Sequence, residues 1–393
     1  MRVSLLDTAR KPGAKILVSG GSRCNVTNAV VSEADFWGGR RTIVRQILRA
    51  LPISETVTFF RELGVPLHEE ADGKLFPDSN RARDVLEALL RESGDRGVRL
   101  LTGHRVLDIT RASGGFTVST SQGDLRAGAV VLATGGRSLP KTGSDGSGYA
   151  IAEKLGHTIV PTTPGLTPLL LSSDGSGSRS LHAAVSGVAH EVDLTVWVDS
   201  AAATRLSGRL LWTHFGISGP VAMNASRHWA RADLEGKRVA ITANFCPGRR
   251  FEDLDAHLTA LAKERSRVSN HTALATLVPA SVAAGLLQRL AIDGDSMLGR
   301  LSRDDRRRLA HALVEWKMPV AGTRGYTYAE VTAGGVALTE VGPATMESRV
   351  CPGLYLVGEI LDVDGRIGGF NFQWAWATGR VAARGLAAAF RDT

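Results

Sequence analysis

The stretch KILVSGGSRCNVTN, residues 15–28, is the strongest indication of the fold class in this sequence. A short apolar run is followed there by a loop rich in glycine and short polar residues. The apolar run predicts a strand, and Gly20 and Gly21 let the backbone after it approach a ligand closely. Arg23 adds a cation suited to a pyrophosphate. Short side chains that can hydrogen-bond to a ligand surround it, namely Ser19, Ser22, Asn25, Thr27 and Asn28. A glycine turn with capping residues would have the same composition, so the local pattern leaves both interpretations open.

A second predicted strand, RVSLLD at residues 2–7, precedes this loop and ends in an acid. In a dinucleotide-binding βαβ unit, the second strand is followed by a carboxylate that binds a ribose hydroxyl. Asp7 is a candidate for that role. Surface strands often end in aspartate, however, so a structural Asp7 is the commoner outcome of this pattern on its own.

Further along the chain, AVVLATGG at residues 129–136 predicts a buried strand with a glycine exit. Ligands of open α/β sheets bind at the carboxyl ends of such strands, which makes this exit a second place of close backbone approach. An ordinary strand exit would have the same sequence.

The stretch GLYLVGEILDVDGRIGGFNF, residues 353–372, combines a strand that ends at Gly358, acidic residues and three further glycines before a helix. Free amides at a helix N-terminus favour an anion or a ring edge rich in carbonyls. The arrangement therefore predicts contacts to the phosphates, ribityl chain or ring of a flavin. Four aromatic residues at helical spacing are expected in the core rather than around a cofactor, namely Phe370, Phe372, Trp374 and Trp376.

Length and composition bound the class of protein. With 393 residues, of which 43% are hydrophobic, the chain can bury two or three structural units. Its three cysteines are widely spaced and form no CxxC pair, which argues against a disulfide framework or a zinc site and favours a reducing compartment. No run of about 18 apolar residues occurs, and the apolar start is too short for a signal peptide, so we expect a cytoplasmic protein that holds no metal and does not bind a membrane.

The formal net charge of +8 is unevenly distributed. Residues 226–324 hold 17 Lys or Arg against 11 Asp or Glu, which accounts for +6 of the total. A solvated helical face is the commoner reason for such a pattern, and a surface that binds a polyanion is the alternative. Nine of the 17 basic residues stand out by their clustering, namely Arg249, Arg250, Lys263, Arg265, Arg267, Arg303, Arg306, Arg307 and Arg308.

These motifs, together with KLFPDSNRARDVLEAL, PGLTPL, RLLWTHFGISGP and AGGVALTEV, occur in an order that spans nearly the whole chain. By the sequence and order of these motifs, the chain resembles the bacterial flavoprotein family of BaiN/RdsA-like, aminoacetone-oxidase-type NAD(P)/FAD-dependent oxidoreductases. The resemblance implies an α/β fold with a glutathione-reductase-like, Rossmann-type FAD domain, an inserted β-barrel-like domain and a small helical domain. The implied boundaries are 1–165 with 325–393 for the FAD domain, 166–247 for the β domain and 248–324 for the helical domain.

The resemblance also implies which residues bind FAD. Asp7 takes the position of the family's ribose-binding acid. The loop near the start would lie beside the flavin with Lys15, Ser19, Gly20, Gly21, Arg23, Cys24 and Asn25. The strand exit in the middle of the chain would contribute Ala133, Thr134 and Gly135. The loop near the end would contribute Gly358, Glu359, Asp362, Gly368, Gly369, Asn371 and Phe372.

The family pattern implies FAD with NAD(P)H as electron donor, but it assigns no catalytic residue here. Cys24 is a candidate redox thiol, with a small buried structural residue as the alternative. His214 is a candidate acid or base, with a structural histidine as the alternative.

One family feature has no counterpart in this sequence. Family members have a strand and a G-x-G-x-x-G turn before the strand that ends at Asp7, and GSDGSG at residues 143–148 is no substitute because it lacks a βαβ context. The segment would comprise about 25 residues. We expect a start site assigned too far downstream rather than true loss, so this chain would bind FAD poorly and a version extended upstream would bind it well.

Three functions remain open at this point. The first is an FAD-dependent oxidoreductase that uses NAD(P)H on a small molecule. The second is flavin-dependent reduction of uridine to dihydrouridine in ribosomal RNA, for which the basic residues between 226 and 324 would supply phosphate contacts. The third is a non-catalytic flavoprotein remnant. Substrate, nucleotide preference and oligomeric state stay undetermined.

Overall fold

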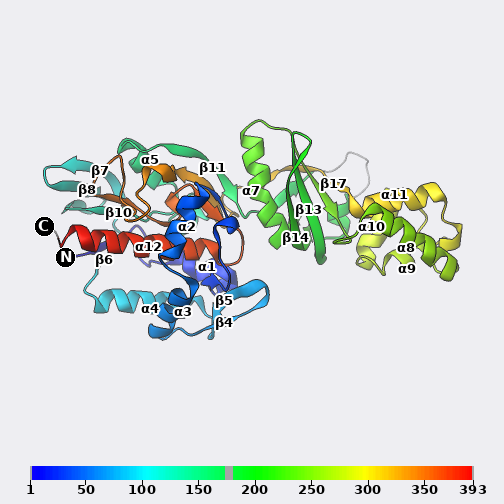
Figure 1. Cartoon of the computed structure of the whole chain (residues 1–393), viewed down its shortest axis with the longest axis horizontal. Coiled ribbons are helices and arrows are strands. Elements are labelled where there is room, and N and C mark those ends of the chain that lie inside the picture. The colour runs from blue at the N-terminus through cyan, green and yellow to red at the C-terminus, as the bar shows by residue number, and fades with distance from the viewer. Residues whose placement is uncertain (1, 173–179, 392–393) are drawn as a thin grey trace. The chain divides into compact units, whose positions relative to one another are not determined.

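The computed structural model describes residues 2–172 and 180–391, and the chain divides into two compact units (Figure 1). The first unit runs up to Thr163 and resumes at Glu330, whereas the second comprises Pro164–Ala329. The second unit is therefore inserted into the chain of the first.

Two pairs of parallel strands organise the first unit. Strand β1 (Ser4–Asp7) lies beside β6 (Arg99–Thr102), and β10 (Val130–Leu132) lies beside β20 (Leu354–Leu356). Pairing of β10 with β20 joins the middle of the chain to its end. The predicted strands within residues 2–7 and 129–136 are confirmed, but Val131 of β10 is 41% exposed, so the expectation of a buried strand there is wrong. Parallel strands with covering helices are the α/β arrangement that the sequence indicated.

Short antiparallel strands complete the first unit. Two sheets have three strands each: β2 (Thr27–Asn28) with β5 (Lys74–Pro77) and β4 (Leu67–Glu69), and β7 (Val106–Ala112) with β8 (Gly115–Thr120) and β9 (Gly123–Ala127). Two further sheets have two strands each: β3 (Phe36–Gly38) with β21 (Val363–Gly365), and β11 (Ile159–Gly165) with β19 (Val331–Val336).

The apolar run at the start of residues 15–28 is a helix, α1 (Ala14–Ser22), so the predicted strand there is wrong. The run is too short for its periodicity to distinguish a strand from a helix. Ile16 and Leu17 pack against a buried cluster that includes Val85 of helix α4 (Ala82–Asp95), and this long-range contact decides the conformation.

Besides α1, five helices carry apolar faces of the first unit: α2 (Arg41–Arg49), α3 (Ile53–Glu62), α4, α5 (Ser147–Lys154) and α12 (Phe370–Ala389). Figure 1 shows α12 beside α2, and the two helices are in contact. Phe370 and Trp374 of α12 are buried against Phe36, with ring centroids 6.2 and 6.1 Å away. The expectation that this aromatic group belongs to the core is therefore confirmed for these two residues.

The sheet of the second unit closes on itself. Its strand order is β17-β16-β13-β14-β15-β12-β18, and the two end strands, β17 (Trp316–Met318) and β18 (Val320–Thr323), are consecutive in sequence. Only Pro319 lies between them. Because proline has no backbone N–H to donate to a neighbouring strand, it fits the point where the segment changes from one partner strand to the other. One segment thus pairs with both ends of the sheet and produces a barrel-like closure. The other strands are β12 (Leu169–Leu171), β13 (Ala189–Val198), β14 (Ala201–Thr213), β15 (Gly216–Ser218) and β16 (Val239–Asn244).

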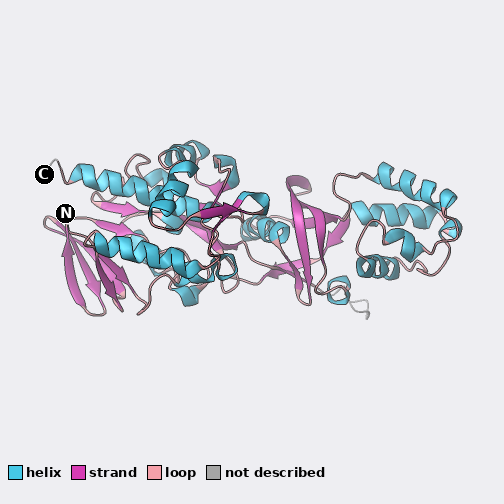
Figure 2. Ribbon diagram, turned by 90° about the horizontal axis from the view of Figure 1, so that it is seen from below, coloured by secondary structure: helices cyan, strands magenta, loops and turns pink. Residues whose placement is uncertain are grey.

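Helices accompany the strands of the second unit, and Figure 2 shows most of them gathered to one side of its sheet. Leu254, Leu286 and Leu309 come from three of these helices. They share one hydrophobic core with residues of the strands, among them Leu194 and Trp212. The helices are α6 (Leu181–Ala184), α7 (Pro220–Leu234), α8 (Phe251–Glu264), α9 (Asn270–Leu274), α10 (Ala280–Arg289) and α11 (Arg303–Val314). Whether residues 248–324 form a domain of their own stays a prediction.

Within the described residues, the helices are all too short or too polar to cross a membrane.

Candidate functional site

The predicted loops near the two ends of the chain meet in the first unit. The Asn28 side chain donates from Nδ2 to the Gly368 carbonyl oxygen at 3.1 Å. With its amide oriented to satisfy both atoms, Asn25 accepts from the Gly369 backbone N–H at 3.0 Å. Thr27 donates from Oγ1 to Gln373 Oε1 at 2.8 Å. The residue 15–28 loop is therefore docked on the start of α12, and we term this junction of the two glycine-containing loops the cradle.

A charged cluster ties three of the predicted segments together. Lys15 Nζ lies 2.5 Å from Glu359 Oε2 and 2.9 Å from Ser138 Oγ. Ser138 donates in turn to Glu359 Oε1 at 2.7 Å, and the Thr332 backbone N–H donates to the same oxygen at 3.0 Å. The Lys15 and Glu359 side chains are only 29% and 17% exposed, so the pair is poorly screened by water.

Sequence reasoning missed Ser138 and Thr332. Ser138 is fully buried and follows the glycine exit of β10 by two residues, so its position directly after a predicted site was the available signal. Thr332 accepts at Oγ1 from the backbone N–H groups of Arg137 and Ser138, at 2.8 and 3.1 Å. No local pattern marks Thr332, because its role depends on a contact with Arg137 across a sequence separation of 195 residues.

Several features of the first unit fit a bound flavin. Gly21 has φ 67° and no described atom within 4 Å of where a Cβ would stand, and Gly358 has φ 73° with only Ala375 Cβ at 3.8 Å. Backbone with open space beside it permits a close ligand approach. The Thr134 hydroxyl is buried and has no hydrogen-bond partner within the described part of the chain. This hydroxyl faces Gly148 and is enclosed by protein, so it is not itself open to a ligand.

Other predicted residues hold the loops in shape. Ser19 donates from Oγ to the Ile16 carbonyl at 2.7 Å, and a Cβ at Gly20 would lie 2.9 Å from the Asn25 nitrogen. Asn371 accepts from the Gly365 N–H at 2.8 Å and donates to its carbonyl at 2.9 Å. These contacts shape the cradle from within.

Five further predicted residues have their own surroundings. Asp7 accepts from the Ala9 N–H at 2.7 Å at the end of β1. The Asp362 carbonyl accepts from the Gly39 N–H at 2.7 Å. Phe372 stacks on the Trp376 ring at 5.5 Å. Gly135 has φ 69° and is packed against Ser144, while Ala133 links it to the end of β10.

Arg23 has a different environment from the one expected for a pyrophosphate ligand. Its guanidinium pairs with Glu70 Oε1 at 2.6 Å and donates to Asn80 Oδ1 at 3.2 Å. It also lies over the Phe76 ring, 4.0 Å from the centroid. The guanidinium lowers the pKa of the Glu70 carboxyl. Arg23 is therefore engaged by protein groups on three sides, which sequence spacing could not reveal.

Cys24 is fully buried among apolar residues that include Val26 and Phe60. Burial raises the pKa of its thiol to about 11, with a smaller opposing effect from a hydrogen bond to Ser19. The thiol is therefore neutral near pH 7, and a neutral thiol is a poor nucleophile. Of the two roles that the sequence left open, this environment favours the structural one.

The Cys24 environment leads to a testable prediction. Alkylation of the folded chain at pH 8, followed by peptide mapping, should modify Cys24 about 100-fold or more slowly than the denatured chain, because its thiolate fraction is that much smaller. The rate should rise about tenfold per pH unit and level off only above about pH 11. Modification at the rate of the denatured control below pH 9 would contradict the buried, neutral thiol.

His214 lies in the second unit, exposed in the turn between β14 and β15. Its ring meets Phe215 edge to face, with centroids 5.1 Å apart. The charged cluster lies in the first unit, so a catalytic role for His214 stays a prediction.

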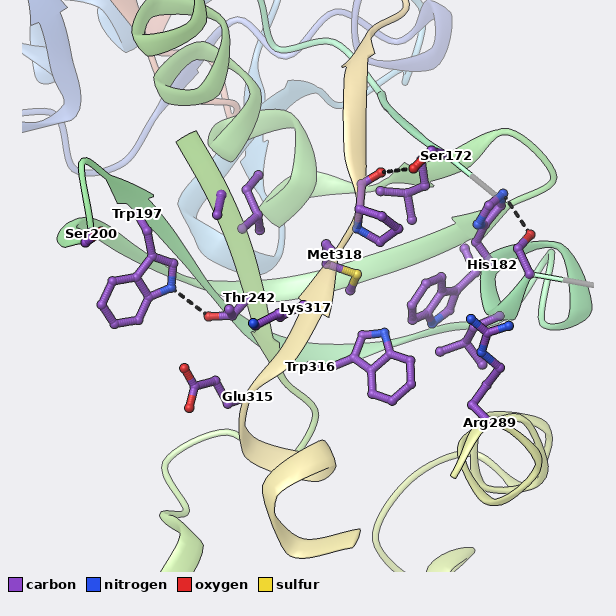
Figure 3. A pocket seen from close by; sticks show the side chains of 17 residues that line it. Ser172, His182, Trp197, Ser200, Thr242, Arg289, Glu315, Trp316, Lys317 and Met318 are labelled. Carbon is purple, nitrogen blue, oxygen red and sulfur yellow. Dashed lines mark hydrogen bonds between the residues drawn. The ribbon is translucent and has the colours of Figure 1, made fainter. Parts of the chain in front are cut away.

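A cavity of about 660 Å³ lies in the second unit, around strand β17 (Figure 3). Trp197 and Thr242 line it on one side of the strand, and Trp197 donates from Nε1 to Thr242 Oγ1 at 2.9 Å. Trp316 and Arg289 line the other side. None of the predicted flavin residues lines this cavity, so it is a different site from the cradle.

Parallel strands, covering helices and glycine loops from both ends of the chain define a Rossmann-type nucleotide-binding protein. The family model described as "HI0933-like protein Rossmann domain" matches residues 1–385, and the chain belongs to that family. Its class is that of FAD-binding oxidoreductases.

Two curated relatives match almost the whole chain. A ribosomal RNA dihydrouridine synthase of Escherichia coli is 33% identical over 388 residues, which cover 99% of this chain and 92% of the relative. A 3-dehydro-bile acid delta(4,6)-reductase of Clostridium scindens is 32% identical over 386 residues, covering 98% and 93%. Among solved structures, E. coli quinol fumarate reductase FrdA is 16% identical with a TM-score of 0.48, covering 99% of this chain and 65% of that one.

Proposed function

We propose that this flavoprotein takes electrons from NAD(P)H and uses them to reduce a ring carbon–carbon double bond in its substrate. The observation that carries the cofactor part is the convergence of Lys15, Ser138 and Glu359 with the docking of Asn25 on Gly369. The names of both curated relatives describe additions of hydrogen to a ring, which supports the substrate class.

The chain's own residues would hold and orient the cofactor. Gly21 and Gly358 leave the backbone accessible to it. The Lys15–Glu359 pair keeps the first and last segments together. When bound, FAD supplies the acceptance and donation of hydride, for which protein side chains have no equivalent.

The test is a measurement of flavin content followed by nucleotide oxidation. The sequence predicts weak FAD binding, so the cofactor is supplied at saturating concentration. We expect the purified chain to take it up under these conditions and, once loaded, to oxidise NADH or NADPH in the presence of a conjugated ring ketone. A colourless protein that still takes up no FAD at saturating concentration would contradict the proposal. A loaded protein that is reduced by neither nucleotide would remove NAD(P)H as donor.

Ribosomal RNA is the second candidate substrate. It is supported by the exposed basic residues of the second unit and by the name of the 33% identical relative. The reduced protein should convert uridine in unmodified ribosomal RNA transcripts into a nucleoside heavier by two hydrogens, detected by mass spectrometry. Turnover of the conjugated ring ketone without any such nucleoside would favour the small-molecule substrate.

A further inference from the structure

A group of exposed cations gathers at one end of the helices of the second unit. We propose that this group, which we term the tip cluster, binds the phosphates of substrate RNA; the inference rests on the RNA function proposed above. The tip cluster consists of Lys263, Arg265, Arg267, Arg300 and Arg303.

Antiparallel packing of α8 and α11 brings the tip cluster together. Phe251, at the start of α8, stacks on His311 near the end of α11, with ring centroids 4.1 Å apart. Asp255, one turn along α8, pairs with Arg306 of α11 at 2.8 Å. The end of α8, with Lys263, must therefore lie beside the start of α11, with Arg303.

Backbone contacts add the remaining members. The Gly299 N–H donates to the Ser266 carbonyl at 3.0 Å, and the Leu298 N–H donates to the Val268 carbonyl at 2.8 Å. The loop after α8, which carries Arg265 and Arg267, is thus held against the short turn that ends at Arg300.

The tip cluster is not neutralised within the part of the chain that the structure describes. All five side chains are exposed, and no ion pair engages any of them there. The exposed acids in the same segments are Glu264 and Asp304, so cations outnumber acids by five to two. Arg303 also lies at the first residue of α11, where a positive charge opposes the helix dipole. Apart from the charge of Asp255, whose pKa Arg306 lowers most and Arg303 helps to lower, the described residues give this group of cations little compensation, which suits contact with a polyanion.

Arg306, Arg307 and Arg308, which the sequence analysis included among the basic residues, contact other protein groups and so differ from the tip cluster. Arg306 is half-buried in its ion pair with Asp255, and this contact is the main reason that the pKa of Asp255 is lowered. Arg308 pairs with Asp305 at 2.7 Å and donates to the Leu290 carbonyl at 2.6 Å. Arg307 lies over the Phe251 ring at 5.2 Å. Neutralising Arg306 or Arg308 would disturb packing, so these are poor choices for a test of RNA contact.

The experiment compares two triple variants with equal change in charge. The test variant carries Arg265→Gln, Arg267→Gln and Arg300→Gln. The control variant carries changes at exposed arginines on the barrel strands and their turn, Arg205→Gln, Arg209→Gln and Arg238→Gln. Binding of ribosomal RNA is measured by filter retention from 50 to 200 mM salt, and NAD(P)H oxidation with the conjugated ring ketone is measured beside it.

We expect the test variant to bind RNA about tenfold or more weakly at ~0.1 M salt, and the slope of log affinity against log salt to fall by about 2–3, because each lost phosphate contact removes close to one unit. The control variant should bind within about threefold of the unchanged chain. Equal losses in both variants, or none in the test variant, would overturn the tip cluster while leaving an RNA substrate possible. If the unchanged chain binds no RNA, both the tip cluster and the RNA function are wrong, whereas ring-ketone turnover would still support the flavin function.

Discussion

Replacement of Gly369 by alanine is expected to destabilise the first unit by about 3 kcal/mol or more, because two costs coincide at this position. Gly369 has φ 94°, a conformation that a residue with a Cβ rarely adopts. The new Cβ would also lie 2.8 Å from Thr27 Cα, and the obstructing atoms are backbone that cannot rotate away. Relief of the clash would separate the residue 15–28 loop from α12. Urea unfolding measures the loss, and a parallel fall in FAD uptake is expected.

Gly379 provides the control for this prediction in the same helix. A Cβ there would have no described atom within 4 Å, and the residue lies inside α12. Gly379→Ala should therefore raise stability by up to about 1 kcal/mol through helix propensity. An unfolding midpoint of Gly369→Ala equal to that of the unchanged chain would show that the loop is not docked on α12 as described.

Replacement of Lys15 by methionine should destabilise the first unit by about 2–4 kcal/mol, because it leaves the poorly exposed Glu359 carboxylate without its cation. Removal of the Glu359 charge in the same chain should recover more than half of that loss, since Gln at position 359 still accepts from Ser138 and the Thr332 N–H. The coupling is measured from urea unfolding of Lys15→Met, Glu359→Gln and the double variant.

An exposed ion pair serves as the comparison. Arg83 and Glu87 lie 3.8 Å apart with side chains 69% and 61% exposed. Arg83→Met should change stability by less than about 0.5 kcal/mol. Strictly additive losses in the Lys15 and Glu359 double variant would mean that the two side chains do not act as a pair.

Helices and strands with a long, regular pattern of apolar and polar residues could be predicted from the sequence. Helices α8 and α11 carry sustained helical periodicity, and β13 and β16 alternate, so each was predictable from its own residues. The order of glycine loops at strand ends indicated a Rossmann-type flavoprotein, because such loops reflect a backbone requirement that any ligand of this kind imposes.

Features that depend on contacts between distant segments of the chain could be established from the tertiary structure alone. Residues 14–18 form a helix, and Ile16 and Leu17 pack against the cluster that includes Val85 of α4, although the short apolar run also fits a strand. The helical geometry breaks at Ser19, Gly20 and Gly21. Lys15 meets Glu359 across a separation of 344 residues, and Arg23 pairs with Glu70 across a separation of 47 residues. Two side chains interact only when they are close in space. The number of residues between them in the sequence does not predict that distance beyond a few helical turns.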